Sequence, residues 1–216
     1  MIEAVVFDLD GILIQTEEIW DEVRERYVRE RGGRYDEAAQ WAMMGMSSFE
    51  WSRFIHEELG VVESPERISA DVVELLEARY RERLPLIPGA VEAVERMAAR
   101  FVLGLASSSN RPLIDVALEL AGLTPLFRAT VSSEEVARGK PAPDVYLEAA
   151  RRLGAAPERC AAVEDSHSGI RSAKSAGMLV VAIPNPSYPP DDEALAQADV
   201  VLRSISELSA SALAGA

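Results

Sequence analysis

The chain has 216 residues, of which 36 are acidic and 22 are basic, so its formal net charge is −14. This acidic balance argues against nucleic acid or an anionic membrane surface as a partner. The single cysteine, Cys160, excludes an internal disulfide. No apolar run approaches the roughly 18 residues that span a membrane. The N-terminus lacks a secretory signal pattern, so we expect a cytoplasmic protein.

The first predicted element is a buried strand over residues 2–8, where β-branched and apolar residues follow one another. A long helical stretch over residues 16–83 comes next, with apolar residues at helical spacing among Glu, Arg and Ala. Glycines and a proline interrupt this stretch at 32–33, near 45 and at 60–65. The sequence therefore predicts about four helices there.

From residue 84 onward, strands and helices alternate along the chain. Helices are expected over 89–99, 111–121, 143–153, 168–176 and shortly after 190, and strands over 101–106, 129–131, 160–163, 179–183 and 199–202. Alternation without hairpin signals is typical of a parallel sheet with helices on both faces. The predicted fold class is therefore α/β. A Rossmann-like parallel sheet core is expected from residues 1–15 and 84–216, with a small helical domain, residues 16–83, inserted after the first strand.

Polar residues follow several of the predicted strands, and ligands of parallel sheets bind at the carboxyl ends of strands. Asp8 and Asp10 stand at the end of the first strand. Of two carboxylates at this spacing, one can act as a nucleophile while the other transfers a proton. The turn at Gly11 can bring backbone N–H groups towards an anion. A simple strand-end turn would explain the same residues, so this motif alone is weak.

Three further segments carry similar signals. The hydroxyls of residues 107–109 suit a phosphate, although a helix N-cap would use them as well. Lys140 is one of only two lysines in a chain rich in arginine, which favours a compact point charge in its proline-rich loop. Glu164 and Asp165 follow an apolar strand, where they need a partner or a hard cation such as Mg²⁺, although acids also suit a helix start. Together these segments predict one site in which a divalent cation and Lys140 attract a phosphate.

In this order, the four segments resemble the motifs of the haloacid dehalogenase superfamily, and in particular its β-phosphoglucomutase-like phosphatases. The matching segments are 7–13 (Phe-Asp-Leu-Asp-Gly-Ile-Leu), 106–109 (Ala-Ser-Ser-Ser), 139–144 (Gly-Lys-Pro-Ala-Pro-Asp) and 163–170 (Val-Glu-Asp-Ser-His-Ser-Gly-Ile). The resemblance covers essentially the whole chain. It implies a mobile helical cap on a Rossmann-like core, with hinges near residues 13–16 and 84–88.

The resemblance also implies an activity, that of a Mg²⁺-dependent phosphomonoester hydrolase acting on a small phosphorylated metabolite. Asp8 would be the nucleophile that forms an aspartyl-phosphate, and Asp10 would be the general acid and base. Ser107, Ser108 and Lys140 would bind the phosphate, and Lys140 would also order Asp8. The residues that would bind Mg²⁺ are Asp8, Asp10 through its backbone carbonyl, Asp165 and, assisting them, Glu164.

The cap is where this chain departs from the sugar phosphomutases of the family. Those enzymes carry a histidine in the first cap helix, where this chain has Trp20. They also hold a second phosphate with a lysine and an arginine beside a cap loop, where this chain has Met44 and Ser48. Hydrolysis is therefore favoured, although Arg53, one turn further on, could partly substitute. The candidate substrate-selecting residues are Trp20, Met44, Gly45, Ser48 and Arg53.

Three alternatives stay open: a sugar phosphomutase, a non-catalytic binding or regulatory module, and a metal-free dehalogenase. The complete set of motifs disfavours the second, and Asp10, which the metal-free dehalogenases lack, disfavours the third. We expect a monomer with no nucleic-acid or membrane partner. His56 is interpreted as a surface residue, His167 as part of a loop or helix start, and Cys160 as a small core residue.

Overall fold

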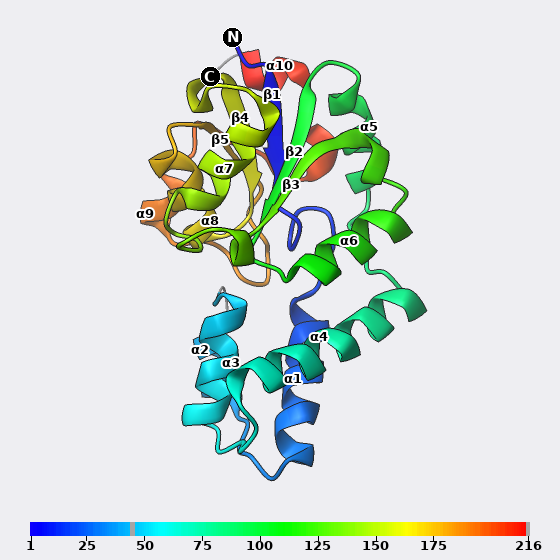
Figure 1. Ribbon diagram of the computed structural model, residues 1–216. Coiled ribbons are helices and arrows are strands. Elements are labelled where there is room, and N and C mark those ends of the chain that lie inside the picture. Colours follow the sequence, from blue (N-terminus) through cyan, green and yellow to red (C-terminus); the bar gives the residue numbers. More distant parts are fainter. Residues whose placement is uncertain (44–45, 215–216) are drawn as a thin grey trace.

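A six-stranded parallel sheet forms one part of the computed structural model, which describes residues 1–43 and 46–214 (Figure 1). The strand order is β3-β2-β1-β4-β5-β6. The strands are β1 (Ala4–Phe7), β2 (Val102–Ser107), β3 (Phe127–Ser132), β4 (Cys160–Glu164), β5 (Leu179–Ala182) and β6 (Val200–Val201). In the central strand β1, Phe7 pairs with Leu105 of β2 and with Val163 of β4. The chain order reverses at β1, which places the topological switch point, and hence the expected ligand site, at its carboxyl end.

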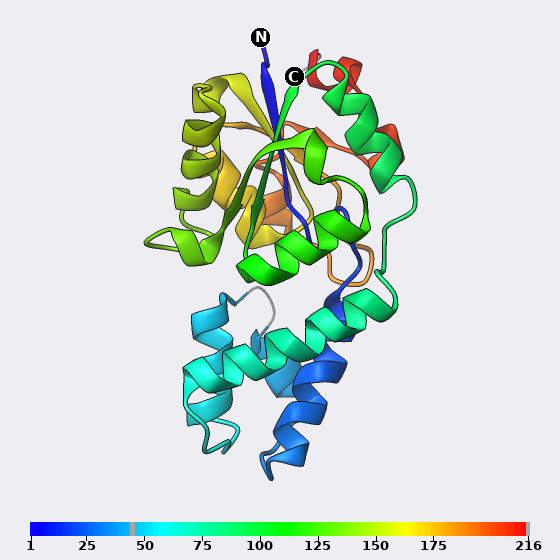
Figure 2. The same cartoon turned by 45° about the vertical axis from the view of Figure 1, so that its right-hand side comes forward.

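Helices cover both faces of the sheet (Figure 2), which confirms the predicted α/β class. One face packs against α5 (Ala90–Ala98) and α6 (Arg111–Leu120), and the other against α7 (Asp144–Leu153) and α8 (His167–Ser175). Side chains alternate along β1: Val5 and Phe7 join the first core, whereas Ala4 and Val6 join the second. Every residue of β1 is therefore buried, as the unbroken apolar run predicts. Two short helices, α9 (Asp192–Leu195) and α10 (Ala210–Ala214), complete this part.

Four helices lie beyond the carboxyl ends of the strands (Figure 1) and form what we call the helical part. They are α1 (Glu17–Glu30), α2 (Glu37–Met43), α3 (Ser48–Glu57) and α4 (Pro65–Glu82), as many as the sequence predicts. Local signals set their starts: Ser47 and Glu50 form a capping box at α3, and the Ser64 side chain caps α4. Among the described residues, no helix is both long and apolar enough to cross a membrane.

The two connections between the sheet and the helical part run side by side. The backbone N–H of Gln15 donates to the carbonyl of Pro85 over 2.8 Å, and that of Ile87 donates to the carbonyl of Leu13 over 2.9 Å. Both connections therefore enter the helical part at one place, next to the end of β1.

Candidate active site

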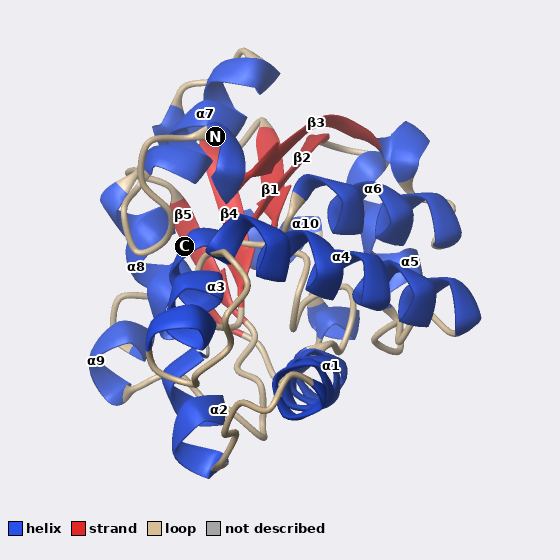
Figure 3. Cartoon of the chain, turned by 60° about the horizontal axis from the view of Figure 1, so that its bottom comes forward, coloured by secondary structure: helices blue, strands red, loops and turns tan. Residues whose placement is uncertain are grey.

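A cavity lies between the carboxyl ends of the strands and the helical part. Figure 3 shows the helices of the helical part in front of the sheet. Its lining on the sheet side includes Asp8, Asp10, Ser108, Ser109, Lys140, Asp165, Ser166, His167, Ser168 and Tyr188. Its lining on the helical side includes Thr16, Glu17, Trp20, Asp21, Arg24, Gln40, Met43, Met46 and Trp51. Residues from all four predicted motifs thus meet at one site.

Asp8 is the residue that follows β1, and its backbone N–H extends the pairing with β4 by donating to Val163 over 3.0 Å. Its carboxylate is buried and accepts a 2.9 Å hydrogen bond at Oδ1 from Nζ of Lys140. Burial raises the pKa of Asp8 to about 8, although the Lys140 charge opposes this rise. Burial would lower the pKa of Lys140, but the carboxylates of Asp8 and Glu164 outweigh it and raise that pKa. The structure therefore keeps Lys140 cationic beside Asp8.

Glu164 is saturated with hydrogen-bond donors. Its Oε1 accepts from Nζ of Lys140 over 2.6 Å and from the hydroxyl of Tyr146 over 2.7 Å. Its Oε2 accepts from the backbone N–H of Asp165 over 3.1 Å and from the backbone and hydroxyl of Ser166 over 3.3 and 3.1 Å. Because both oxygens are fixed in this way, Glu164 holds the Lys140 ammonium in place against Asp8.

Three buried carboxylates can hold a metal ion. Ligand oxygens of Asp8, Glu164 and Asp165 all lie within 4.8 Å of one another. Burial, together with the charges of Glu164 and Asp8, raises the pKa of Asp165 well above its usual value, so Lys140 alone does not offset this cluster. A Cβ atom at Gly11 would lie 1.9 Å from Oδ2 of Asp165, so glycine leaves the room that this carboxylate occupies. A hard, oxygen-binding cation such as Mg²⁺ fits this donor set.

Asp10 is oriented by three hydroxyl groups. Thr16 donates to its Oδ1 over 2.6 Å, and Ser109 donates to its Oδ2 over 2.7 Å, while Ser107 contributes a longer contact of 3.4 Å. The sequence analysis included Ser109 in the serine run but named only Ser107 and Ser108 as phosphate ligands, and it did not predict the contact of Ser109 with Asp10. The structure buries Ser107 behind the cavity, where its hydroxyl also accepts from the backbone N–H of Ser109 over 3.0 Å.

Comparison with known proteins identifies the family. Residues 2–177 match the haloacid dehalogenase-like hydrolase family. Hexitol phosphatase B of Escherichia coli K12 is 33% identical over 219 aligned positions, covering 98% of this chain and 96% of that protein. A bifunctional riboflavin kinase/FMN phosphatase of Arabidopsis thaliana is 30% identical over 95% of this chain, which spans only 54% of that longer protein. CbbY from Rhodobacter sphaeroides, solved in complex with phosphate, superimposes with a TM-score of 0.87 at 28% identity, covering 99% of this chain and 100% of that one.

The chain belongs to the haloacid dehalogenase-like hydrolase family. This confirms the resemblance drawn from the four motifs, the fold class, and the prediction of a phosphatase of this type.

The helical part carries the candidate substrate-selecting residues of this family member. Trp20 lines the cavity and packs edge-on against Trp51, with ring centroids 5.8 Å apart. Ser48 is buried at the start of α3 and does not line the cavity. Met44 and Gly45 lie outside the described residues.

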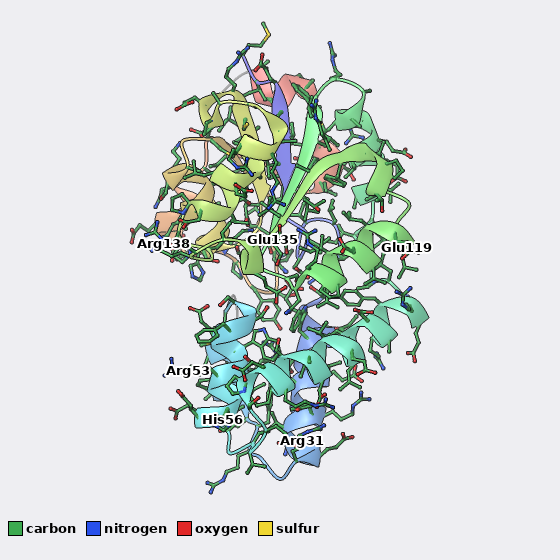
Figure 4. The ribbon with its side chains drawn as sticks, viewed as in Figure 1. Arg31, Arg53, His56, Glu119, Glu135 and Arg138 are labelled. Carbon is green, nitrogen blue, oxygen red and sulfur yellow. The ribbon has the colours of Figure 1, made fainter. Side chains whose placement is uncertain are left out.

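The structure does not bring Arg53 to the cavity, contrary to the expectation that it partly substitutes for a phosphate-binding cation. Residues two positions apart on a helix point in nearly opposite directions. Trp51 takes the inner face of α3, so Arg53 points outward, where it pairs with Glu57 over 2.7 Å (Figure 4). Its guanidinium therefore serves a surface ion pair.

The remaining residues named in the sequence analysis are His56, His167 and Cys160. His56, labelled with Arg53 at the periphery of the helical part in Figure 4, has its Nδ1 3.0 Å from the carbonyl of Val61. His167 starts α8 and is exposed at the edge of the cavity. Cys160 is buried in β4. These positions agree with the interpretations given above.

On the face of α1 that lines the cavity, the sequence analysis named Trp20 and missed its three neighbours. Glu17, Trp20, Asp21 and Arg24 all line the cavity, and their spacing of three, four and seven residues places them on one side of a helix. That spacing can be recognised in the sequence, but it does not determine which face of the helix lines the cavity.

Proposed function

We propose that this haloacid dehalogenase-like hydrolase is a Mg²⁺-dependent phosphomonoester hydrolase acting on a small phosphorylated metabolite through an aspartyl-phosphate on Asp8. The observation that carries the proposal is the different hydrogen bonding of the two carboxylate oxygens of Asp8, which lines the cavity. Its Oδ1 is held by Lys140, whereas its Oδ2 accepts no hydrogen bond from the described residues. The phosphatase names of the relatives support the same activity class.

In the first step, an oxygen of Asp8 attacks phosphorus and the bond to the substrate oxygen breaks. Asp10 gives its proton to that leaving oxygen, so the alcohol departs neutral. Thr16 and Ser109 fix the direction of the Asp10 carboxyl group. The positive charge of Lys140 stabilises the charge that spreads over the phosphoryl oxygens.

In the second step, Asp10 is a carboxylate and accepts a proton from a water molecule. That water attacks phosphorus, and the bond between phosphorus and the Asp8 oxygen breaks. Inorganic phosphate leaves, and both aspartates return to their starting states. Positioning and charge neutralisation carry most of such a reaction.

Mg²⁺ would be held by Asp8, the Asp10 backbone carbonyl and Asp165, with Glu164 assisting. Bound there, it would offset the repulsion between the carboxylates and an incoming phosphate. The side chains that face this position supply only oxygen ligands, which suits Mg²⁺ better than softer metals.

The helical part, residues 16–83, is proposed to act as a cap that closes on the core, residues 1–15 and 84–216. The paired connections near 13–16 and 84–88 are the proposed hinge, because both chain crossings lie together there. Closure would exclude bulk water from the aspartyl-phosphate and present the substrate-selecting residues.

The test is release of inorganic phosphate from a panel of phosphomonoesters, measured with Mg²⁺ and with EDTA. The expected result is release that needs Mg²⁺ and disappears in Asp8→Asn, while the thermal unfolding of that variant stays cooperative. A folded Asp8→Asn protein with full activity would overturn the mechanism. Glucose 1-phosphate is included in the panel, because isomerisation without phosphate release would favour a phosphomutase.

A further inference from the structure

The face of α1 that lines the cavity runs away from the catalytic aspartates. Glu17 is the first residue of the helix and directly follows Thr16, which binds Asp10. Arg24 lies seven residues further on the same face, and both line the cavity. At 1.5 Å per residue, the two positions are about 10 Å apart along the helix axis. The cavity therefore extends along α1, and Arg24 lines its far end, which is the end away from the catalytic aspartates.

Arg24 is buried at this far end, with only 6% of its surface exposed. Its Nε donates to the carbonyl of Trp20 over 3.2 Å, and Nη1 lies 3.5 Å from the carbonyl of Met43. Its guanidinium carbon lies 5.4 Å from the centre of the Trp20 ring. These contacts hold the guanidinium between α1 and α2. The two carbonyl oxygens accept from its N–H groups, but neither they nor the Trp20 ring neutralise its positive charge.

No carboxylate of residues 1–43 or 46–214 lies within 4.0 Å of the Arg24 guanidinium nitrogens. Burial lowers the pKa of Arg24, and the charge of Asp21 on the same face opposes this only from beyond ion-pair distance, while its carboxylate accepts a 2.5 Å hydrogen bond from the hydroxyl of Tyr35. The other lysine or arginine in the described lining, Lys140, is held by Asp8 and Glu164. A buried cation without an ion pair is costly unless a ligand supplies the opposite charge.

We propose that Arg24 binds an anionic group at the end of the substrate remote from the transferred phosphate. The substrate class is then a phosphomonoester with a second anionic group, either a carboxylate or a second phosphate. This rests on the phosphatase function proposed above. A neutral hydroxyl at the same place would accept a hydrogen bond from Arg24 but would leave its charge unmatched.

The experiment compares substrates that differ only at the remote end. Sorbitol 6-phosphate and 6-phosphogluconate share a six-carbon chain, and the second carries a carboxylate where the first has an alcohol. Fructose 6-phosphate and fructose 1,6-bisphosphate make the same comparison for a second phosphate. The measured quantity is the ratio of kcat/KM for the charged member to that for the neutral member of each pair. The pair with the larger ratio shows whether the remote anionic group that Arg24 binds is a carboxylate or a phosphate.

The expected wild-type ratio is about tenfold or more in at least one pair, because a hydrogen bond to a charged group contributes that much. Arg24→Gln should lower that ratio by about tenfold, mainly through a higher KM for the charged substrate. Arg53→Gln is the matched control: it removes the other candidate arginine of the helical part, which pairs with Glu57 outside the cavity, and should leave the ratio as it is.

A second variant keeps the test decisive if Arg24→Gln fails to fold. Gln40 lines the cavity from α2, one helical turn before Met43, whose carbonyl lies 3.5 Å from Nη1 of Arg24. Gln40→Glu is nearly isosteric and adds a negative charge to this part of the cavity. It should lower the same ratio because the added carboxylate repels a second anion. No loss of the ratio in a folded Arg24→Gln would overturn the proposal, and so would an unchanged ratio in Gln40→Glu where Arg24→Gln does not fold.

The outcomes separate this inference from the phosphatase function. Mg²⁺-dependent phosphate release from both members of each pair at equal kcat/KM would overturn only the role of Arg24. No release from any of the four substrates or from p-nitrophenyl phosphate would overturn the phosphatase function and the inference with it.

Discussion

Lys140 donates a 2.9 Å hydrogen bond to Asp8, a residue 132 positions away in the chain. The side chains are 3% and 9% exposed, so water screens their charges little. Lys140 is also bound to Glu164, which means that two buried carboxylates share one ammonium group. This arrangement holds one oxygen of Asp8 in place. The charge of Lys140 also stabilises both buried carboxylates in the folded protein.

Lys140→Met is expected to abolish turnover and to destabilise the protein. Removal of one partner of a buried ion pair typically lowers the free energy of unfolding by about 3–5 kcal/mol, because the remaining charges are left unpaired. Steady-state phosphate release and urea unfolding in EDTA measure the two effects. Lys174→Met is the control, since Lys174 is the other lysine of the chain and forms a partly exposed pair with Asp199. A Lys140→Met protein with wild-type turnover would contradict the role assigned to this lysine.

Ser109→Ala is expected to lower kcat by about tenfold with a smaller change in KM. The Ser109 hydroxyl donates a 2.7 Å hydrogen bond to Asp10, and a lost hydrogen bond to a charged group is worth about that factor. Ser108→Ala is the comparison, because Ser108 lines the cavity as a candidate phosphate ligand and should act on KM. Equal kcat values for wild type and Ser109→Ala would show that Thr16 and Ser107 orient Asp10 without Ser109.

The sequence predicted the strands and the four motifs because strand ends and site residues coincide in a parallel sheet. Once β1 and β4 were recognised, Asp8 and Asp165 had to lie at the same edge. The contact of Ser109 with Asp10 was not predicted, because the direction of a hydroxyl in a turn depends on local backbone angles that a run of three serines does not reveal.

The helical part was harder to predict, because the phase of a helix relative to the cavity depends on tertiary packing. Arg53 was chosen by its nearness in sequence to the cap loop, yet α3 turns it outward and presents Trp51 to the site. Arg24 lies in a stretch rich in Glu and Arg, where nothing local marks one arginine as buried. Only the packing of α1 against its neighbours distinguishes it.

Gly11→Ala is expected to remove activity and to weaken the response to Mg²⁺. Gly11 has φ +79°, and the added Cβ would lie 1.9 Å from Oδ2 of Asp165, so this carboxylate must move. Gly154→Ala is a matched control, since Gly154 has φ +72° with no atom within 4 Å of the added Cβ. The control should lose only the roughly 1–2 kcal/mol cost of a left-handed residue and keep its kcat. Full activity in Gly11→Ala would show that catalysis does not require the Asp165 carboxylate in its present position.

Glu17 connects the start of α1 to the segment after β5, because the side-chain amide of Asn185 donates to it over 3.0 Å. Burial raises the pKa of this carboxyl group above its usual value. A folded-state pKa that lies above the unfolded value gives a contribution to stability that is complete at low pH and is lost as the pH rises. Glu17→Gln keeps the neutral form at every pH, so its melting temperature relative to wild type should increase with pH.

The measurement is thermal unfolding of both proteins at about pH 4.5 and at about pH 8, because the change in their difference isolates the titrating group from any constant effect of the substitution. Glu18→Gln is the control: it removes the same charge from the same helical turn at an exposed position, where the carboxylate keeps its hydration. The pH-dependent gain should therefore be larger for Glu17→Gln than for Glu18→Gln. A difference between Glu17→Gln and wild type that stays constant, or that falls towards pH 8, would mean that the contact with Asn185 favours the charged form more than burial disfavours it.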